Sequence, residues 1–344
     1  MMKTRRSTWT GAMLAAALLP LLFAPSVASA HGGGDAAPEV TLLASGLEGA
    51  SGGTIGPDGA LYVGEGTTGE ITRIDTRTGA ASTFATGLPP AVNPIGGVTD
   101  VAFVGRTAYA LVTLVDPGAG GAAVSGIYRI DDADSSTVVA DLGAWSIAHP
   151  PTTEFFVPSG VQFAFEPVRG GFVVTDGHHN RVLLAGLSGR ITQLAQFENT
   201  VPTGLDLAGA RLYVAEAGPT PHLPEEGRIV VMNPWRSMAH EVAAGAPLLV
   251  DVEAGRCGLY GLSQGAWTGG EPGSPASPDT GSLVEVTRGG GLSVVVDGLD
   301  RPTSVYFARD AAFVIGLAGE VWRIDHVFAN DRGAKGGCRG HGRW

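Results

Sequence analysis

The sequence lacks several short motifs that mark large enzyme classes. It contains no H-E-x-x-H or C-x-x-C motif and no glycine-rich phosphate-binding loop followed by a lysine. Each of these motifs carries a defined chemistry, namely a catalytic zinc, a redox or zinc-binding cysteine pair, and a nucleotide cradle. Their absence argues against zinc metalloproteases, dithiol oxidoreductases and P-loop nucleotide-binding proteins.

Long apolar runs are confined to the start of the chain. Residues 1–30 combine early cations, an apolar stretch over 11–27 and an Ala-Ser-Ala ending. This pattern is typical of a cleaved export signal. We therefore predict a signal peptide over 1–30, a flexible segment over 31–38, and a secreted or extracytoplasmic mature protein without a membrane span.

Cysteine is scarce, because the chain contains only Cys257 and Cys338. In an oxidising compartment, the simplest interpretation is one disulfide that joins the C-terminal tail to the body. The alternative is a free or intermolecular thiol. The tail, residues 327–344, is glycine-rich and locally basic, and we expect it to be a flexible end.

Basic charge is also scarce. The chain has 22 Lys and Arg residues against 33 Asp and Glu residues, and its net charge of -11 becomes -14 once residues 1–30 are removed. An anionic surface of this kind repels nucleic acid and anionic membranes. We therefore exclude nucleic acid as a partner, and we expect a monomer that meets a small molecule or an extracellular protein.

One strand-like phrase returns throughout the rest of the chain. It reads GEITRID at Gly69–Asp75, GIYRID at Gly126–Asp131 and GEVWRID at Gly319–Asp325, and weaker copies bring the number to six. Each copy follows a second short strand, such as LYVGE at Leu61–Glu65, and that strand follows a third one built of small residues. A repeated phrase indicates a structural unit rather than a catalytic motif.

The repeat predicts an all-β fold, a six-bladed β-propeller over residues 39–326. Its segments are short, β-branched and punctuated by Gly, Pro and Asp, and helical periodicity is hard to find after residue 40. A single blade exposes both faces, so neighbouring blades must pack in a closed ring. The last copy lacks a fourth strand, whereas Glu39–Leu47 resembles the outer strands elsewhere. We therefore predict that the N-terminal strand completes the last blade.

These blades resemble six-bladed NHL-type and gluconolactonase-like propellers, and most of all the exported ScyD/ScyE family. The stretch Pro158–Phe197 carries the resemblance best, and the likeness extends over residues 39–325. It implies an exported accessory propeller without an established catalytic motif. Gluconolactonase-like enzymes hold an axial metal with Glu, Asn and Asp side chains, and the aligned positions of this chain show no matching Glu/Asn set.

Alignment of the six copies places one small residue of each blade at the start of its innermost strand. In blade three this strand is PSGVQF, Pro158–Phe163. The four hydroxyl-bearing residues of the set are candidate ligand-binding residues: Thr99, Ser159, Thr203 and Thr303. Three nearby carboxylates suit calcium or another divalent cation: Asp100, Asp206 and Asp251. A metal site is thus a hypothesis, although we predict no cofactor.

Histidines gather in loops that the repeat places on one face. They are His149, His178, His179 and His222, and the same face receives long insertions, one of which contains Trp267. Loops on a rigid scaffold are frequent places for binding residues, and histidines bind metals or carry protons. Alternatively, the histidines are polar turn residues and the aromatic rings pack against the blades.

Two functional hypotheses follow. The first is a non-enzymatic, exported propeller of ScyD/ScyE type that binds a ligand or protein on its loop-rich face. The alternative is a metal-dependent hydrolase or lyase, or an oxidoreductase, of the gluconolactonase-like propeller class with an axial site. A stoichiometric metal that depends on Asp100 or Asp251 would favour the second hypothesis.

Overall fold

The computed structural model describes residues 36–219, 222–236, 238–256, 258–270 and 273–328. The chain divides into two units, 1–34 and 35–344, and all described residues belong to the second. The expected signal peptide, both cysteines and residues 329–344 of the expected tail lie outside the described residues.

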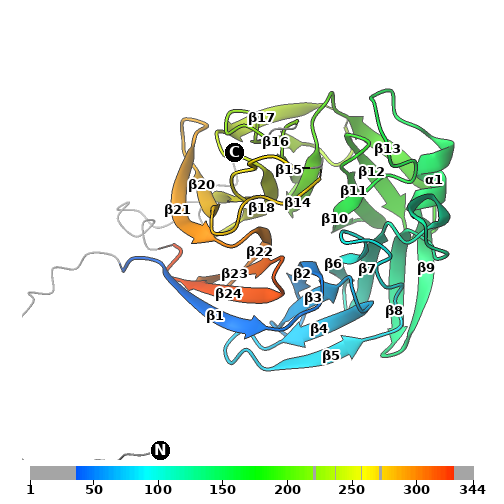
Figure 1. Cartoon of the computed structure of the whole chain (residues 1–344), viewed down its shortest axis with the longest axis horizontal. Coiled ribbons are helices and arrows are strands. Elements are labelled where there is room, and N and C mark those ends of the chain that lie inside the picture. Colours follow the sequence, from blue (N-terminus) through cyan, green and yellow to red (C-terminus); the bar gives the residue numbers. More distant parts are fainter. Residues whose placement is uncertain (1–35, 220–221, 237, 257, 271–272, 329–344) are drawn as a thin grey trace, which may run out of the picture. The chain divides into compact units, whose positions relative to one another are not determined.

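Six four-stranded antiparallel sheets surround one axis, as Figure 1 shows. From the axis outward, blade one contains β2 (Ala50–Ile55), β3 (Leu61–Glu65), β4 (Glu70–Ile74) and β5 (Ala81–Ala85). Blade two contains β6 (Gly97–Val104), β7 (Thr107–Thr113), β8 (Gly126–Asp132) and β9 (Ser135–Asp141). Blade three contains β10 (Gln162–Val168), β11 (Gly171–Asp176), β12 (Arg181–Gly186) and β13 (Ile191–Gln196).

The second half of the ring repeats this order. Blade four contains β14 (Pro202–Ala208), β15 (Arg211–Glu216), β16 (Arg228–Met232) and β17 (Ala239–Ala244). Blade five contains β18 (Leu249–Ala254), β19 (Leu259–Ser263), β20 (Gly281–Val286) and β21 (Leu292–Leu299). Blade six contains β22 (Pro302–Ala308), β23 (Ala311–Gly316), β24 (Glu320–Asp325) and β1 (Glu39–Ser45). The predicted six-bladed propeller is confirmed.

The N-terminal strand closes the ring. β1 pairs antiparallel with β24, from Glu39 opposite Asp325 to Ser45 opposite Glu320. The last blade therefore takes three strands from the end of the described chain and one from its beginning. This closure was predicted from the missing fourth strand, and it is confirmed.

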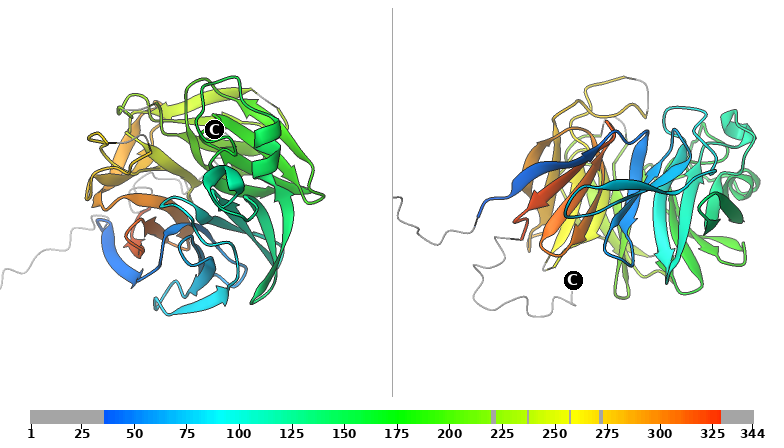
Figure 2. Two further views of the ribbon diagram at one scale, coloured as in Figure 1. Left: turned by 45° about the vertical axis from the view of Figure 1, so that its right-hand side comes forward. Right: turned by 90° about the horizontal axis from the view of Figure 1, so that it is seen from below.

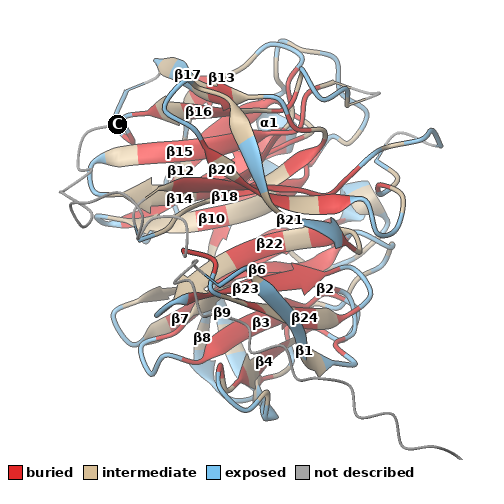
Figure 3. Cartoon of the chain, turned by 90° about the vertical axis from the view of Figure 1, so that its left-hand side faces the viewer, coloured by how far each residue is buried: buried red, intermediate tan, exposed pale blue. Residues whose placement is uncertain are grey.

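The core is distributed between the blades. Six apolar clusters each join two neighbouring blades. In the cluster that closes the ring, blade one contributes Leu61 and Val63, and blade six contributes Phe313 and Ile315. The second strands read as unbroken apolar or small runs because both of their faces are covered. Figure 3 shows the resulting buried layer in the middle of each blade. Stability of such a fold depends on contacts between adjacent repeats.

The two faces of the ring differ in the length of their connections, as the side view in Figure 2 shows. We call the face where the inner strands begin the loop face, because it carries the long segments 114–125, 142–161, 217–227 and 264–280. We call the opposite face, where each inner strand turns into the second strand, the turn face. The short helix α1 (Leu142–Ala148) and the 3-10 turn η1 (Pro117–Ala119) both belong to the loop face.

Blade three departs from the predicted alignment. The inner strand was expected at Pro158–Phe163, but β10 begins at Gln162, which pairs with Asp176 as Pro202 pairs with Glu216 in blade four. The cause is a turn, because the Gly160 amide donates to the carbonyl of Val157 and Gly160 has a φ of 72°. This left-handed conformation favours glycine. The turn delays the strand by four residues.

Candidate functional site

The inner strands carry a level of polar side chains near the turn face. Glu166, Asp206 and Tyr306 are each third from the end of their strands, β10, β14 and β22, and Glu253 is the penultimate residue of β18. We call these four residues the axial acid level. They come from four consecutive blades, so the closed ring brings them toward one axis.

The carboxyl groups of this level act on one another electrostatically. Burial raises the pKa of Glu166 well above its ordinary value, and the carboxyls of Asp206, Asp100 and Asp251 raise it further. Burial likewise raises the pKa of Glu253, with additional contributions from four other carboxyls. The neighbouring charges that shift the pKa values of both glutamates are all acidic. Such unpaired, perturbed acids are more frequent at functional sites than elsewhere.

Glu166 and Glu253 stand apart from the polar contacts that join the described residues. Neither carboxyl makes a hydrogen bond or ion pair with any of the described residues, and both side chains keep partial contact with solvent although protein surrounds them. The hydroxyl of Tyr306 accepts a hydrogen bond from the Gly53 amide at 2.7 Å. Burial, followed by the carboxyls of Asp100 and Asp251, raises the pKa of Tyr306 well above its ordinary value. Tyr306 therefore keeps its proton, and its hydroxyl can donate a hydrogen bond while it accepts one from Gly53.

The three aspartates predicted as metal ligands instead connect the blades. Asp100 accepts hydrogen bonds from the amides of Val101 and, across the blade boundary, Phe165 at 3.0 Å. Asp251 does the same with Val252 and Val305, both at 2.8 Å. Asp206 accepts from the Ala254 amide of blade five at 2.8 Å. Burial raises the pKa of all three, that of Asp251 to about 8.

These positions do not fit a divalent cation. Within the described residues, no group of three or more His, Cys, Asp or Glu side chains is placed to hold a metal ion together. The amide donors of the neighbouring blade occupy carboxylate oxygens that a cation would need. The sequence-based metal hypothesis on Asp100, Asp206 and Asp251 is thus not supported by their geometry.

The predicted hydroxyl ring also links blades rather than facing a ligand. Thr99 lies 3.3 Å from the carbonyl of Gln162, Thr203 donates to that of Leu249 at 2.9 Å, and Thr303 donates to that of Ser51 at 2.6 Å. Each acceptor belongs to the next blade. Ser159 is not part of the ring, because the position equivalent to Thr203 is Phe163 in the corrected alignment. The Ser159 hydroxyl is buried and has no hydrogen-bond partner in the part of the chain that the structure describes.

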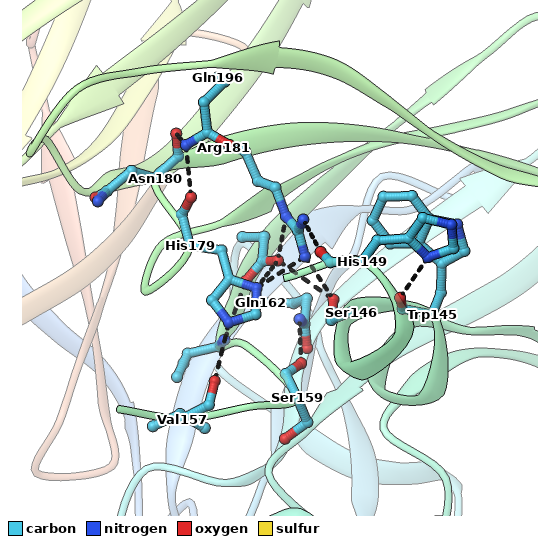
Figure 4. A network of polar contacts seen from close by, with 12 residues as sticks. Trp145, Ser146, His149, Val157, Ser159, Gln162, His179, Asn180, Arg181 and Gln196 are labelled. Atoms are coloured by element: carbon cyan, nitrogen blue, oxygen red, sulfur yellow. Dashed lines mark hydrogen bonds and ion pairs between the residues drawn. The ribbon is translucent and has the colours of Figure 1, made fainter. Parts of the chain in front are cut away.

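Two of the predicted histidines belong to a buried polar network on blade three, shown in Figure 4. The Arg181 guanidinium donates to Asp176 at 2.9 Å, to the carbonyl of His149 at 2.7 Å and to Ser146 at 3.0 Å. It also approaches Nδ1 of His179 at 2.8 Å and lies over the ring of Trp145. We call these six residues the blade-three clasp.

The clasp fixes the long segment 142–161 against the blade. Nε2 of His179 is 2.9 Å from the carbonyl of Val157, so this nitrogen carries the proton and Nδ1 accepts from Arg181. The ring of His149 stacks on Trp145 with centroids 4.3 Å apart. Asp176, His179 and Arg181 are all fully buried. His149 and His179 thus hold a loop in place, which agrees with the alternative interpretation of the histidines.

The other loop-face candidates lie in two places. His178 contacts Phe156, whose side chain is 67% exposed, and burial lowers the pKa of His178. His222 contacts Trp267 of the next loop with ring centroids 6.2 Å apart, and Trp267 donates to Ser274 at 2.9 Å. Among the described residues, no hydrogen bond, ion pair or ring contact joins the first pair to the second, so the structure does not assemble the candidates into one site.

Two pentapeptides match G-x-S-x-G, at Gly49–Gly53 and Gly261–Gly265. A nucleophile elbow requires a strand followed by a helix. Ser51 instead lies in β2, and Ser263 ends β19 and donates to the carbonyl of Pro247. Neither serine is a catalytic candidate.

Comparison with solved structures supports the architecture. Aldose sugar dehydrogenase from Streptomyces coelicolor, in its PQQ-bound form, is 12% identical with a TM-score of 0.53, and the match covers 84% of this chain and 98% of that chain. An oxidoreductase from Thermus thermophilus, described as a glucose dehydrogenase, is 16% identical with a TM-score of 0.58, covering 83% and 99%. A gluconolactonase from Xanthomonas campestris is 12% identical with a TM-score of 0.58, covering 84% and 89%.

This chain is therefore similar in fold to gluconolactonase-like six-bladed propellers. No protein-family model matches it, and no curated protein matches it either. The first functional hypothesis, a non-enzymatic binding propeller, is contradicted, because the similar propellers named above are enzymes. No described helix is both long and apolar enough to cross a bilayer.

Proposed function

We propose that this protein is a propeller enzyme whose catalytic centre is the axial acid level. The observation that carries the proposal is the pair Glu166 and Glu253, two carboxyls without a partner among the described residues. Both lie with Tyr306 on the inner strands of a closed ring. Unpaired carboxyls with raised pKa values are suited to general acid–base catalysis near neutral pH. The names of the structural neighbours make sugars and sugar lactones the first substrates to test.

The chemistry that this arrangement supports best is hydrolysis of a lactone or related ester. Burial and neighbouring carboxyls raise the pKa of both glutamates, and in this mechanism Glu166 is the ionised partner and Glu253 the protonated one. Ionised Glu166 accepts a proton from water, whose oxygen attacks the carbonyl carbon. Tyr306 donates a hydrogen bond to the developing oxyanion. Glu253 protonates the departing ring oxygen as the carbon–oxygen bond breaks, which leaves a hydroxy acid.

The cofactors of the related propeller classes fit this centre less well. A divalent metal lacks a set of three converging ligands among the described residues. Pyrroloquinoline quinone is a tricarboxylate, and the axial carboxyls would repel it unless they were protonated. We therefore derive the reaction from the side chains of this chain alone, and we place hydrolysis ahead of oxidoreduction.

The test compares matched glutamate variants. Purified protein should hydrolyse one or more aldonolactones. The reaction is measured by the acid that it releases into weakly buffered solution. Glu166→Gln and Glu253→Gln should each lower kcat/KM by about 100-fold or more, whereas Glu241→Gln, at an exposed site on β17, should leave it unchanged. Full activity in both axial variants, with native circular dichroism, would contradict an axial centre.

Three further expectations accompany this proposal. Residues 1–30 export the protein, and Cys257 forms a disulfide with Cys338. Membership of the ScyD/ScyE family rests on the stretch Pro158–Phe197. N-terminal sequencing of secreted protein tests the first, and peptide mapping without reduction tests the second.

A further inference from the structure

Asp206 is the member of the axial acid level that the proposed reaction does not use. Its carboxylate accepts a hydrogen bond at 2.8 Å from the amide of Ala254 in the next blade, and Ala254 directly follows Glu253 in β18. The amide belongs to the peptide unit that is joined to the α-carbon of Glu253. The hydrogen bond therefore fixes the backbone from which the Glu253 side chain extends.

The other two reacting groups have the same kind of support. In each case an aspartate of the preceding blade accepts the amide hydrogen of the residue just before the reacting group. The acceptors and donors are Asp100 and Phe165 at 3.0 Å, before Glu166, and Asp251 and Val305 at 2.8 Å, before Tyr306. All three groups of the proposed reaction are thus one residue away from a hydrogen bond that crosses a blade boundary.

The inner strands gain a second anchor from these bonds. β10, β18 and β22 are each the edge strand of their sheet and pair only with the second strand of their own blade. An edge strand leaves one row of backbone groups without a ladder partner. The aspartates bind three amides of these strands, beside the side chains that need a defined position.

A carboxyl is a costly means of joining two blades. Burial raises the pKa of all three aspartates, so the folded protein disfavours their charged forms. A hydroxyl makes such a link without this cost, as Thr203 does between the same two blades when it donates to the carbonyl of Leu249 at 2.9 Å. The repeated use of aspartate beside the reacting groups therefore points to a purpose beyond blade packing.

We propose that the three aspartates are positioning residues, each of which holds one reacting group in the place that hydrolysis requires. The pairs are Asp100 with Glu166, Asp206 with Glu253, and Asp251 with Tyr306. This inference rests on the proposed function, because the three groups must act on one substrate. A displacement of about 1 Å in such a centre can lower the rate about 100-fold.

Matched substitutions in blade four test the proposal. Asp206→Val removes the acceptor of the Ala254 amide, whereas Asp206→Asn keeps a carbonyl oxygen for it, and both remove the carboxyl charge. Asp206→Val should therefore have a kcat about 10–100-fold below that of Asp206→Asn, with KM values that agree within about twofold. Thr203→Val is the structural control. It removes a different bond between blades four and five, and it should lower stability but leave kcat unchanged.

Two further measurements show whether the effect passes through Glu253. In the Glu253→Gln background, Asp206→Val should lower kcat by less than about a further twofold, because no acid remains to be positioned. A general loss of folded protein would instead lower kcat equally in both backgrounds. Hydrogen exchange followed by NMR checks the bond itself, since the Ala254 amide should exchange at least about tenfold faster in Asp206→Val than in Asp206→Asn.

The outcomes separate this inference from the proposed function. The positioning role is overturned if Asp206→Val and Asp206→Asn have the same kcat while Glu166→Gln and Glu253→Gln are impaired. It is also overturned if Thr203→Val lowers kcat as much as Asp206→Val does. Wild-type protein without hydrolytic activity would reject the proposed function and the positioning role together.

A second set of variants applies if Asp206→Val lacks the native circular dichroism spectrum. Asp100→Val and Asp100→Asn then give the same comparison through Glu166, because Asp100 binds the Phe165 amide. Thr99→Val is the matched control, since Thr99 lies 3.3 Å from the carbonyl of Gln162 across the same blade boundary. Equal kcat values for the two Asp100 variants would overturn the proposal.

Discussion

Replacing Asp251 by asparagine should change how the stability of the protein depends on pH. The side chain is 7% exposed, and its two oxygens accept amide hydrogens of Val252 and Val305 at 2.8 Å. Burial raises its pKa from 3.8 to about 8, against the effect of these two donors, and Asp206 adds to the rise. The folded state therefore binds this proton more tightly than the unfolded state does.

Proton linkage determines whether stability rises or falls with pH. A carboxyl whose pKa is raised by folding contributes its full stability below the unfolded pKa and loses it as pH rises through the folded pKa. One pKa unit corresponds to about 1.36 kcal/mol, so the rise of about four units amounts to about 5–6 kcal/mol as an upper value. Glu166 and Glu253 act in the same direction because their pKa values are also raised.

Urea denaturation of wild type and Asp251→Asn between pH 4 and pH 9 measures the effect. The asparagine leaves one of the two amide donors facing an NH2 group, which costs about 1–3 kcal/mol at every pH. The variant should thus be less stable than wild type at pH 4, and the two curves should converge and cross as the pH approaches 9. Parallel curves, or a wild type whose stability rises over this interval, would refute the reasoning.

Two other substitutions and one deletion test the architecture. Arg181→Met should lower the free energy of unfolding by about 3–5 kcal/mol because it leaves Asp176 buried without its cation. In urea denaturation, adding Asp176→Asn should restore part of this loss. Gly97→Ala should cost at least about 1–3 kcal/mol because φ is 87°, and a β-carbon there would lie 2.2 Å from the carbonyl of Gly66; a neutral result would mean that the turn rearranges. Deleting residues 39–45 should expose the edge of β24 and cause self-association, seen as earlier elution than that of the undeleted protein in size-exclusion chromatography. An unchanged elution volume would contradict ring closure by β1.

The repeat made the architecture predictable from the sequence. Each second strand is covered on both sides, so its apolar run and the aromatic residue in it recur in every blade. The missing outer strand of blade six likewise pointed to Glu39–Leu47, because a closed ring leaves no blade with three strands. The fold was predictable because the strand pattern repeats in every blade and because the ring must close. Both facts can be recognised in a single sequence.

The candidate site was less predictable for two physical reasons. Blade three begins its inner strand after a glycine turn, so Ser159 was aligned with Thr203 although Phe163 is its equivalent. The same four-residue error concealed that Glu166 is equivalent to Asp206. Small polar residues near the axis were interpreted as ligand contacts, whereas Thr99 and Asp100 satisfy backbone groups of the next blade.

A weak sequence signal for Glu253 and Tyr306 was present in the repeat. Glu253 and Tyr306 occupy the same position in their strands as Asp206, opposite the aromatic residue of the second strand. A comparison of that single position across the six blades would have identified them. Their significance comes from convergence on one axis, which only the closed ring establishes.

The pairing of β1 with β24 has a mechanical consequence. Glu39 and Asp325 are opposite one another at the same end of the ladder, so a force that separates the two chain ends acts on one hydrogen-bonded pair at a time. The hydrogen bonds between β1 and β24 would therefore break one after another from this end, instead of sharing the force along the whole ladder. Tethering both ends to separate surfaces would therefore weaken the molecule, whereas joining them by a short linker would protect its seam.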